Sequence, residues 1–385
     1  MQRPARLAAT LTLPLVLACA ASPDAHADDP PQRFTERTEY HGIQVERLAA
    51  GLEHPWSVAF LPRGRFLVTE RPGRLQRIDR DGSATRIGGL PDITARGQGG
   101  LLDVSLHPRF EENQLVYLSF SRAEGRRDTV LAVVRGRLVE DRLEDVEEIF
   151  VQNRASSPGR HYGSRIAWLP DGTLLLSIGD RGSEPMRAQD TRDHAGSLLR
   201  LNDDGTIPED NPFVGNEDVL DAIYSTGHRN IQGLVVTPDG TVWATEHGPR
   251  GGDLLHRVQA GHNYGWPVVT QGLDYRTERE IREFEGRSAA GVTPHAHDFG
   301  PTLAPSGLAF VTSERFPRWE GNLLAGGLRA ERIRRLTLID NEVRHDEELL
   351  LQRIGRIRDV REGPDGHLYV LTDASDGALW RISPQ

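Results

Sequence analysis

Six segments of the chain share one pattern: an apolar run, a turn around a proline, and a second apolar run. They are Ser57–Val68, Val104–Leu118, Ile166–Ser177, Gly233–Thr245, Gly307–Gly326 and Asp359–Thr372. Proline fixes φ and glycine tolerates positive φ, so each segment predicts a two-stranded β-hairpin. Such hairpins cannot bury both faces alone, and six of them favour an all-β, six-bladed β-propeller with a central channel over residues 41–385. A pair of β-sandwiches with coincidental turns is the alternative.

The composition agrees with a fold rich in strands and turns. Of the 385 residues, 40 are glycine and 24 are proline, and aromatic residues make up 6%. These proportions are typical of turn-rich β proteins. The stretch His41–Leu48 is expected to add a strand to the blade that also holds the C-terminus, which would close the ring. Residues 28–40 are predicted to form a linker before it.

The first 27 residues have the pattern of a secretory signal peptide. The apolar run Leu11–Ala21 is too short to span a bilayer, and Ala25-His26-Ala27 fits the small-x-small cleavage rule. We therefore expect a periplasmic protein that begins near Asp28 and has no transmembrane segment after signal removal. Lipoprotein processing at Cys19 is the alternative. Cys19 is the only cysteine, so the folded part has no disulfide.

Charge and polar residues narrow the class of ligand. The net charge of -10 makes a nucleic acid an unsuitable partner. Segments rich in Gly, His, Arg and Asn flank the apolar runs, at positions that converge on one mouth of a propeller. They are Arg96–Leu101, His161–Arg165, Gly227–Gly233, Glu246–Asp253, Asn263–Pro267 and Arg356–Asp359. Converging arginines with a histidine indicate a site for an anionic, planar ligand, because guanidinium groups match carboxylates.

These segments, in this order, resemble the soluble pyrroloquinoline quinone (PQQ)-dependent aldose sugar and glucose dehydrogenases. The shared motifs are GQGGLLDV, H-x-G-x-R-I, the pair Gly179-Asp180, GHRN-x-QG, EHGPRGGD, NYGWP, R-x-RD and LTD. The resemblance runs from about Leu48 to the C-terminus. It implies a six-bladed propeller that oxidises an aldose at C1 to the lactone, with PQQ and Ca²⁺ as cofactors and an unidentified electron acceptor.

The resemblance also implies residue roles. His161 matches the catalytic base, Asp180 the carboxylate that orients it, and Arg229 an arginine beside the quinone. The expected PQQ contacts are Gln98, Arg229, Asn230, Tyr275, Arg356 and Arg358. Arg329 is the nearest candidate where the family commonly has a lysine. Gly248 and Pro249 match the pair whose carbonyls bind calcium. Tyr264 is retained from a second calcium site, but Leu254 replaces the glutamate that often accompanies it.

Two other function classes remain open at this level. A calcium-dependent lactone hydrolase on the same propeller plan would need a metal held by side-chain carboxylates and amides. A non-catalytic binding propeller would keep the motifs for shape alone. The chain lacks a G-x-G-x-x-G fingerprint in a βαβ setting, which argues against a nicotinamide cofactor.

Overall fold

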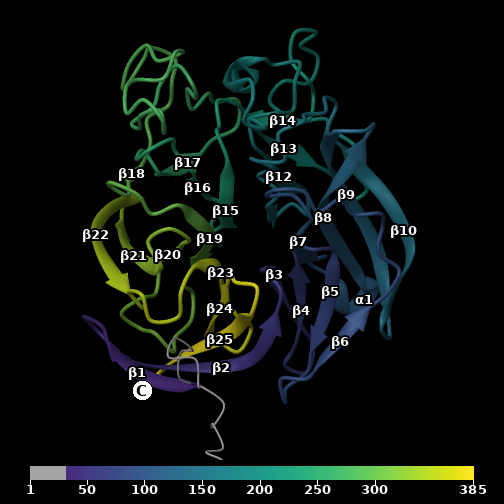
Figure 1. The fold of residues 1–385 in the computed structure, drawn as a ribbon, viewed down its shortest axis with the longest axis vertical. Helices are drawn as coiled ribbons and strands as arrows, with labels where there is room; N and C mark the ends of the chain where they lie inside the picture. Colours follow the sequence, from purple (N-terminus) through teal and green to yellow (C-terminus); the bar gives the residue numbers. More distant parts are fainter. Residues whose placement is uncertain (1–31) are drawn as a thin grey trace, which may run out of the picture. The chain divides into compact units, whose positions relative to one another are not determined.

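Each of the six predicted hairpins forms the two innermost strands of a separate antiparallel sheet. The computed structural model describes residues 32–385; the predicted signal peptide, its cleavage site and Cys19 lie outside that range. Figure 1 shows the sheets arranged around a common centre. The fold is therefore the expected all-β, six-bladed β-propeller.

The first three blades follow the order of the chain. Blade one contains β3 (Pro55–Leu61), β4 (Arg65–Glu70), β5 (Arg74–Ile78) and β6 (Ala84–Ile87). Blade two contains β7 (Leu101–Leu106), β8 (Leu115–Glu124), β9 (Asp128–Val139) and β10 (Arg142–Val151). Blade three contains β11 (Ile166–Trp168), β12 (Leu174–Ile178), β13 (Ser197–Leu201) and β14 (Ile223–Ser225). The short helix α1 (Phe110–Asn113) and a 3₁₀ turn (Pro185–Gln189) are the helical elements in the described part of the chain.

The last three blades include the closure of the ring. Blade four contains β15 (Ile231–Val236), β16 (Val242–Glu246), β17 (Leu254–Val258) and β18 (His297–Asp298). Blade five contains β19 (Pro305–Phe310), β20 (Leu323–Gly327), β21 (Arg332–Ile339) and β22 (Glu342–Leu349). Blade six contains β23 (Ile357–Glu362), β24 (Leu368–Thr372), β25 (Gly377–Pro384), β2 (Gly42–Leu52) and β1 (Arg33–Arg37).

The N-terminal strand β2 pairs with the C-terminal strand β25, so hydrogen bonds between the two ends of the described chain complete the last blade. This confirms the strand expected at His41–Leu48. Residues 28–40 were expected to be a linker, yet Arg33–Arg37 forms β1 against β2. The polar sequence of β1 does not predict a strand; its antiparallel pairing with β2 holds it in the extended conformation.

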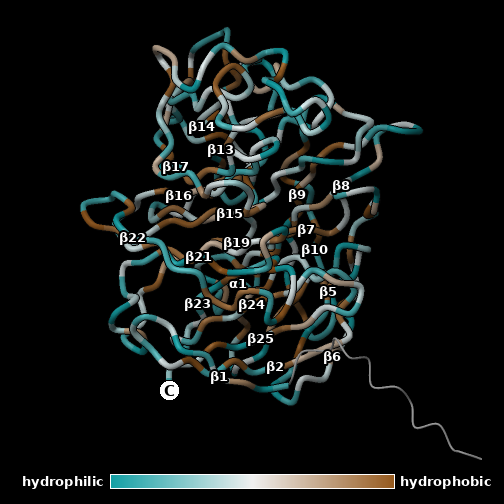
Figure 2. The backbone as a smooth tube through the Cα atoms, turned by 60° about the vertical axis from the view of Figure 1, so that its left-hand side comes forward, coloured by the Kyte–Doolittle hydropathy of each residue, from teal (hydrophilic) through white to brown (hydrophobic). Residues whose placement is uncertain are grey.

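The hydrophobic core is divided into layers between neighbouring blades. Strand β12 shows the effect, because all five of its residues are buried by the blades on either side. A strand covered on both faces needs a continuous apolar run, which is the pattern the sequence shows. In Figure 2 much of the brown, hydrophobic backbone follows the strands. No helix in residues 32–385 is long and apolar enough to cross a membrane.

Polar contacts near the axis hold the inner strands in register. The buried Asp103 on β7 accepts hydrogen bonds from Ser57 Oγ at 2.5 Å and from the Ile166 N–H at 2.7 Å. Its carboxylate also lies 3.2 Å from Arg165 Nη1, and the same guanidinium contacts Asp359 at 3.0 Å. These contacts join four blades, which fixes the blade ends that carry the candidate site.

Candidate active site

His161 and Asp180 are brought together by the hairpin between them. Strands β11 and β12 pair with Ile166 opposite Leu176, so the residues just before β11 and just after β12 lie at the same end of the blade. His161 Nδ1 is 2.6 Å from Asp180 Oδ1. The backbone passes so close that a Cβ on Gly179 would lie 2.3 Å from the His161 carbonyl oxygen. Only glycine fits there, which explains the Gly179-Asp180 pair.

Asp180 is held in place by two further donors. Trp266 Nε1 donates to Oδ2 at 2.8 Å, and the Gly182 N–H donates to Oδ1 at 2.8 Å. Burial alone raises the pKa of Asp180, but His161 and Arg229 outweigh it and hold the pKa below its usual value. An ionised carboxylate only accepts hydrogen bonds, so His161 Nδ1 donates to it and Nε2 keeps its lone pair.

A cavity of about 450 Å³ is connected to this pair through Gln98 in its wall. It is lined by His54, Trp56, Arg71, Gly97, Gln98, Asn230, Gln232, His247, Ala304, Leu328, Arg356, Arg358 and Asp373. Four of the residues expected to contact a cofactor are among them: Gln98, Asn230, Arg356 and Arg358. The His161 N–H donates to Gln98 Oε1 at 2.8 Å, which links the histidine to the cavity wall.

One carboxylate, that of Asp373, contacts three basic side chains in the cavity wall. Asp373 Oδ2 accepts from Arg358 Nη2 at 2.9 Å and from Arg356 Nη2 at 3.2 Å, and Oδ1 lies 2.9 Å from His54 Nδ1. Although burial raises the pKa of Asp373, Arg358 and His54 hold it below its usual value. Asp373 thus remains ionised and orients both guanidinium groups toward the same side.

Two buried nitrogen atoms in the cavity residues have no hydrogen-bond partner. They are Arg358 Nε and His247 Nε2. Burial lowers the pKa of His247 well below its usual value, with the charge of Arg229 acting in the same direction. The neutral imidazole and the free guanidinium nitrogen are polar groups available to an occupant of the cavity, since buried polar atoms are usually paired.

Arg229 lies beside the histidine rather than among the residues that line the cavity. Its Nη1 donates to the His247 carbonyl at 3.0 Å, and its guanidinium carbon is 5.2 Å from the centre of the Trp266 ring. Burial lowers the pKa of His161, and the positive charge of Arg229 lowers it further, against the opposing effect of Asp180. The neutral imidazole needed for a base is therefore favoured.

Arg329 and Tyr275 do not line the cavity. Arg329 is exposed, and the preceding Leu328 occupies the cavity wall instead. The Tyr275 side chain is 63% exposed, and its hydroxyl donates to the Gly248 carbonyl oxygen at 3.3 Å. Tyr275 thus lies next to a residue expected to bind calcium, whereas Arg329 points to solvent.

The Gly248-Pro249 turn is held by a buried carboxylate. The Gly248 N–H donates to Asp253 Oδ1 at 2.9 Å, and Oδ2 accepts from the N–H groups of Leu303 and Ala304 at 2.8 and 2.7 Å. A Cβ on Gly248 would lie 2.1 Å from the Gly252 carbonyl oxygen, so the turn requires glycine. This fixed turn offers neutral carbonyl oxygens, which are suitable ligands for Ca²⁺.

Tyr264 is buried away from the Gly248-Pro249 turn, in the layer between blades three and four. Its hydroxyl donates to the Arg257 carbonyl at 2.8 Å and accepts from the Gln259 N–H at 2.9 Å. The ring stacks on His228, with 4.8 Å between the ring centres. The hydroxyl of Tyr264 thus has partners within the protein, and its ring serves packing.

Several residues of the site were not assigned roles from the sequence. They are His54, Gln232, His247, Trp266 and Asp373. Four of them stand inside the motifs that carry the resemblance: Gln232 in GHRNIQG, His247 in EHGPRGGD, Trp266 in NYGWP and Asp373 in LTD. The motifs were therefore a usable signal, although sequence could not say which partner each side chain contacts.

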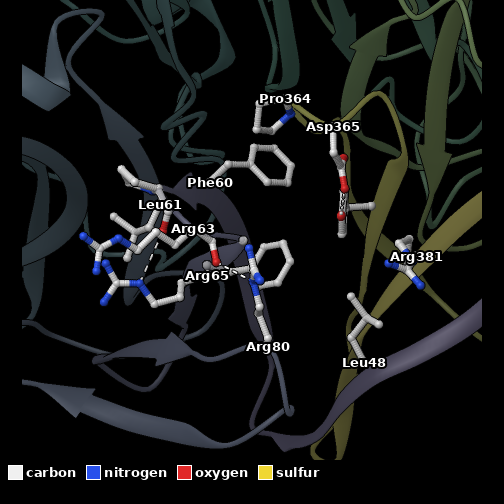
Figure 3. A pocket seen from close by; sticks show the side chains of 13 residues that line it. Leu48, Phe60, Leu61, Arg63, Arg65, Arg80, Pro364, Asp365 and Arg381 are labelled. Carbon is white, nitrogen blue, oxygen red and sulfur yellow. Dashed lines mark hydrogen bonds between the residues drawn. The ribbon is translucent and has the colours of Figure 1, made fainter.

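A larger cavity, of about 670 Å³, lies at the opposite end of the blades, where the hairpin turns are. Figure 3 shows Arg63, Arg65 and Arg80 near Phe60, with Arg381 on the other side of the space. Two of these arginines are bound to backbone oxygens: Arg65 to Pro62 at 3.3 Å and Arg80 to Arg63 at 2.6 Å. None of the catalytic, cofactor or metal residues expected from the sequence lines this cavity.

Comparison with known proteins gives a consistent family. The sequence profile of the family described as Glucose / Sorbosone dehydrogenase matches residues 52–381. An uncharacterised protein of Synechocystis, slr1608, is 44% identical over 361 residues, covering 88% of this chain and 86% of that protein. The aldose sugar dehydrogenase YliI of Escherichia coli is 39% identical over 348 residues, covering 89% of this chain and 93% of YliI.

Solved structures agree with these sequence matches. The apo-form of the soluble aldose sugar dehydrogenase of Escherichia coli superposes with a TM-score of 0.86 at 39% identity, covering 89% of this chain and 100% of that one. The PQQ-bound form of an aldose sugar dehydrogenase from Streptomyces coelicolor superposes with a TM-score of 0.72 at 26% identity, covering 92% of this chain and 100% of that one.

Proposed function

The chain belongs to the glucose/sorbosone dehydrogenase family, and we propose that it oxidises aldose sugars at C1 to the lactone with PQQ and Ca²⁺ as cofactors. One observation carries the proposal. The His161–Asp180 pair is joined by the His161–Gln98 hydrogen bond to the wall of a cavity of about 450 Å³ that also contains Arg356 and Arg358. The name of the Streptomyces coelicolor relative, a PQQ-bound aldose sugar dehydrogenase, supports the same assignment.

The residues of the cavity fit a planar, multiply charged anion such as PQQ. Arg356 and Arg358 are held side by side by Asp373, and the buried Arg358 Nε has no partner of its own. Guanidinium groups bind carboxylates through paired hydrogen bonds, and PQQ carries several carboxylates. Gln98 and Asn230 add neutral polar groups to the wall. Gly248 and Pro249 would hold Ca²⁺ through their carbonyl oxygens.

The chain's own residues supply the acid–base part of the reaction. His161 Nε2 takes the proton of the C1 hydroxyl, because Nδ1 is engaged with Asp180 at 2.6 Å. Asp180 fixes this tautomer and stabilises the imidazolium that forms. Burial, and after it the positive charge of Arg229, lowers the pKa of His161 and favours the neutral imidazole before the reaction. When bound, PQQ would be the acceptor of the hydride that leaves C1, and Ca²⁺ held by Gly248 and Pro249 would supply Lewis-acid polarisation.

The cellular setting of this activity follows from the N-terminal sequence. A signal peptide cleaved after Ala27 would deliver the enzyme to the periplasm, where the electrons pass to an acceptor outside the chain. Mass spectrometry of the mature protein tests this. A start near Asp28 supports periplasmic export, and a diacylglyceryl group on Cys19 would instead make it an anchored lipoprotein.

Reconstitution of the purified apo-protein tests the activity. We expect reduction of an artificial dye with glucose or another aldose only when PQQ and Ca²⁺ are both added. Formation of lactone in step with dye reduction supports the proposal. Hydrolysis of a lactone with Ca²⁺ alone, or ligand binding without any turnover, would contradict it in favour of one of the other two classes.

The structure gives the hydrolase alternative little support. A hydrolytic metal is expected on side-chain carboxylates and amides that face the substrate. Within residues 32–385, one group of three His, Cys, Asp or Glu side chains is close enough to share an ion, namely His228, Glu246 and His256. None of the three lines the cavity beside His161. The arginine-lined cavity therefore favours the oxidoreductase.

A further inference from the structure

Blade four contains three metal-binding side chains that face one another below the surface. His228 precedes β15, Glu246 ends β16, and His256 lies in β17. One ligand atom of each residue lies within 4.8 Å of the other two. All three residues are buried, and they form no part of the cavity described above. We refer to them as the His–Glu–His cluster.

The register of the sheet brings two of the three residues to one face. Strand β16 pairs with β17 so that Ala244 lies opposite His256. Glu246 is two residues beyond Ala244 and therefore projects from the same face as His256, as a diagonal neighbour. His228 approaches from the loop before β15, and the next residue, Arg229, donates its N–H to Glu246 Oε1 at 2.9 Å.

Hydrogen bonds outside the cluster orient its ligand atoms inward. Ser225 Oγ lies 2.9 Å from His228 Nε2, which leaves His228 Nδ1 facing Glu246 Oε2 at 3.0 Å. The same carboxylate oxygen is 3.4 Å from His256 Nε2. Contacts of this kind, from a serine and a backbone N–H, are the usual supports that fix the tautomer and rotation of metal ligands.

His256 lacks the hydrogen bonds expected of a buried imidazole. The residue is 2% exposed, Nδ1 has no hydrogen-bond partner, and Nε2 has only the long 3.4 Å contact with Glu246 Oε2, which is too poorly aligned for a hydrogen bond. Its ring is enclosed by Tyr264, whose ring centre is 4.9 Å away and whose hydroxyl is bound elsewhere. Buried polar groups are usually paired, so the ring nitrogens of this imidazole, next to a carboxylate, are available to a cation.

We propose that His228 Nδ1, Glu246 Oε2 and His256 Nε2 bind one divalent transition metal, with Zn²⁺ as the best match. Zinc prefers imidazole and carboxylate ligands at about 2.0–2.1 Å, so tetrahedral ligand atoms lie about 3.3 Å apart. The two separations from Glu246 Oε2, 3.0 and 3.4 Å, match this value. Two neutral imidazoles disfavour Ca²⁺, which takes oxygen ligands. A water would complete the tetrahedron.

The metal would join the loop before β15 to the end of β16 and the middle of β17 in blade four. Glu246 is followed directly by His247 and Gly248, and Arg229 follows His228, so the cluster would anchor the loops that carry the candidate active site. Burial lowers the pKa of His228, which agrees with a neutral imidazole ready to act as a ligand. The role is structural, because all three ligand residues are buried.

Metal titration of the purified protein without PQQ tests the proposal. Chelator-treated protein, kept in excess Ca²⁺, should take up one Zn²⁺ per chain by elemental analysis, and Tm should rise by about 2–5 °C. His256→Gln should lower the affinity for Zn²⁺ at least about tenfold. His107→Gln is the matched control, since His107 is buried beside a single carboxylate, Asp203, at 3.5 Å.

Equal affinity for Zn²⁺ in the parent and His256→Gln would overturn the site, as would no uptake by the parent. If His256→Gln does not fold, anomalous diffraction from parent crystals soaked in zinc decides the question. A peak between His228, Glu246 and His256 supports the proposal, and its absence at saturating zinc rejects it. Because no sugar or PQQ is used, these results are independent of the proposed dehydrogenase activity.

Discussion

Asp180 Oδ1 lies 2.6 Å from His161 Nδ1, although 19 positions separate the two residues along the chain. A single hairpin, β11–β12, accounts for the contact, because it returns the chain to the end of the blade from which it left. The base and its orienting carboxylate are thus carried by one rigid element. A loop of another blade adds one support, because Trp266 Nε1 donates to Asp180 Oδ2 at 2.8 Å.

Substitution His161→Gln tests the role of the base. Turnover should fall by about 10²–10⁴-fold, the usual contribution of general base catalysis, because glutamine cannot take the proton of the sugar hydroxyl. PQQ affinity should remain near that of the parent, since the contact from His161 to Gln98 is made by the backbone N–H. Turnover near the parent value with PQQ bound would mean that the base lies elsewhere.

Substitution Asp180→Asn is expected to change the pH profile as well as the rate. The carboxylate raises the pKa of His161, so neutralising it lowers that pKa further. The active imidazole is the neutral form, and the acid limb of kcat should therefore move to lower pH. The plateau should also fall, by less than in His161→Gln. Asp171→Asn, in the turn of the same hairpin, is the control, and an unmoved acid limb in Asp180→Asn would contradict the prediction.

Substitution Trp266→Phe removes the 2.8 Å hydrogen bond to Asp180 Oδ2. Hydrogen bonds to buried charges contribute about 1.5–3 kcal/mol, so kcat should drop about tenfold or more as Asp180 loosens. Trp243→Phe is a matched control, because the buried Trp243 Nε1 has no partner to lose. Stopped-flow measurement of sugar oxidation with PQQ in excess would compare kcat in Trp266→Phe and Trp243→Phe. Similar kcat values in both variants would argue against a role for this hydrogen bond.

A structural element can be predicted from the sequence when the residues that determine it lie close together along the chain. The six hairpins are set by proline turns and by apolar runs within about 20 residues, so the sequence alone indicates them. Strand β1 was missed because Arg33–Arg37 is polar and alternates between exposed and half-buried positions. Its order comes from pairing with β2, a contact that composition does not reveal.

Contacts within the candidate site are likewise predictable when they are local in sequence and unpredictable when they are not. The contact of His161 with Asp180 follows from one hairpin, whereas Trp266 reaches Asp180 from a loop 86 positions further along the chain. Arg329 was expected near the cofactor by alignment of motifs. The chain turns after Gly327, which pairs with Arg332, so Leu328 faces the cavity and Arg329 faces solvent. One position along a tight turn decides which side chain faces inward, and motifs do not resolve that.

Substitution Asp373→Asn should weaken PQQ binding. The carboxylate positions Arg356, Arg358 and His54, and its loss leaves two guanidinium groups without their shared partner. Removing a negative charge would by itself favour an anionic ligand, but breaking a buried, hydrogen-bonded charge contact costs more. We expect a loss of affinity of about 10–100-fold in a spectroscopic titration. Asp376→Asn, which affects only a surface contact to the Gly51 N–H, is the control. Tighter binding by Asp373→Asn would show that charge outweighs positioning.

Removal of calcium should weaken PQQ binding even though the arginines remain. In the proposed site the cavity arginines would bind the carboxylates of PQQ, and Ca²⁺ held by the Gly248-Pro249 turn would add a second, separate contact. Exhaustive chelation should therefore raise the Kd for PQQ at least about tenfold. Ca²⁺ should restore affinity better than either Zn²⁺ or Mg²⁺, since Mg²⁺ demands a smaller octahedral site.

Asp253→Asn should raise the Ca²⁺ concentration required for PQQ binding, because Asp253 accepts the Gly248 N–H at 2.9 Å. Asp239→Asn, in an exposed turn of the same blade, should not. Unchanged PQQ affinity after chelation would contradict the proposed calcium site directly.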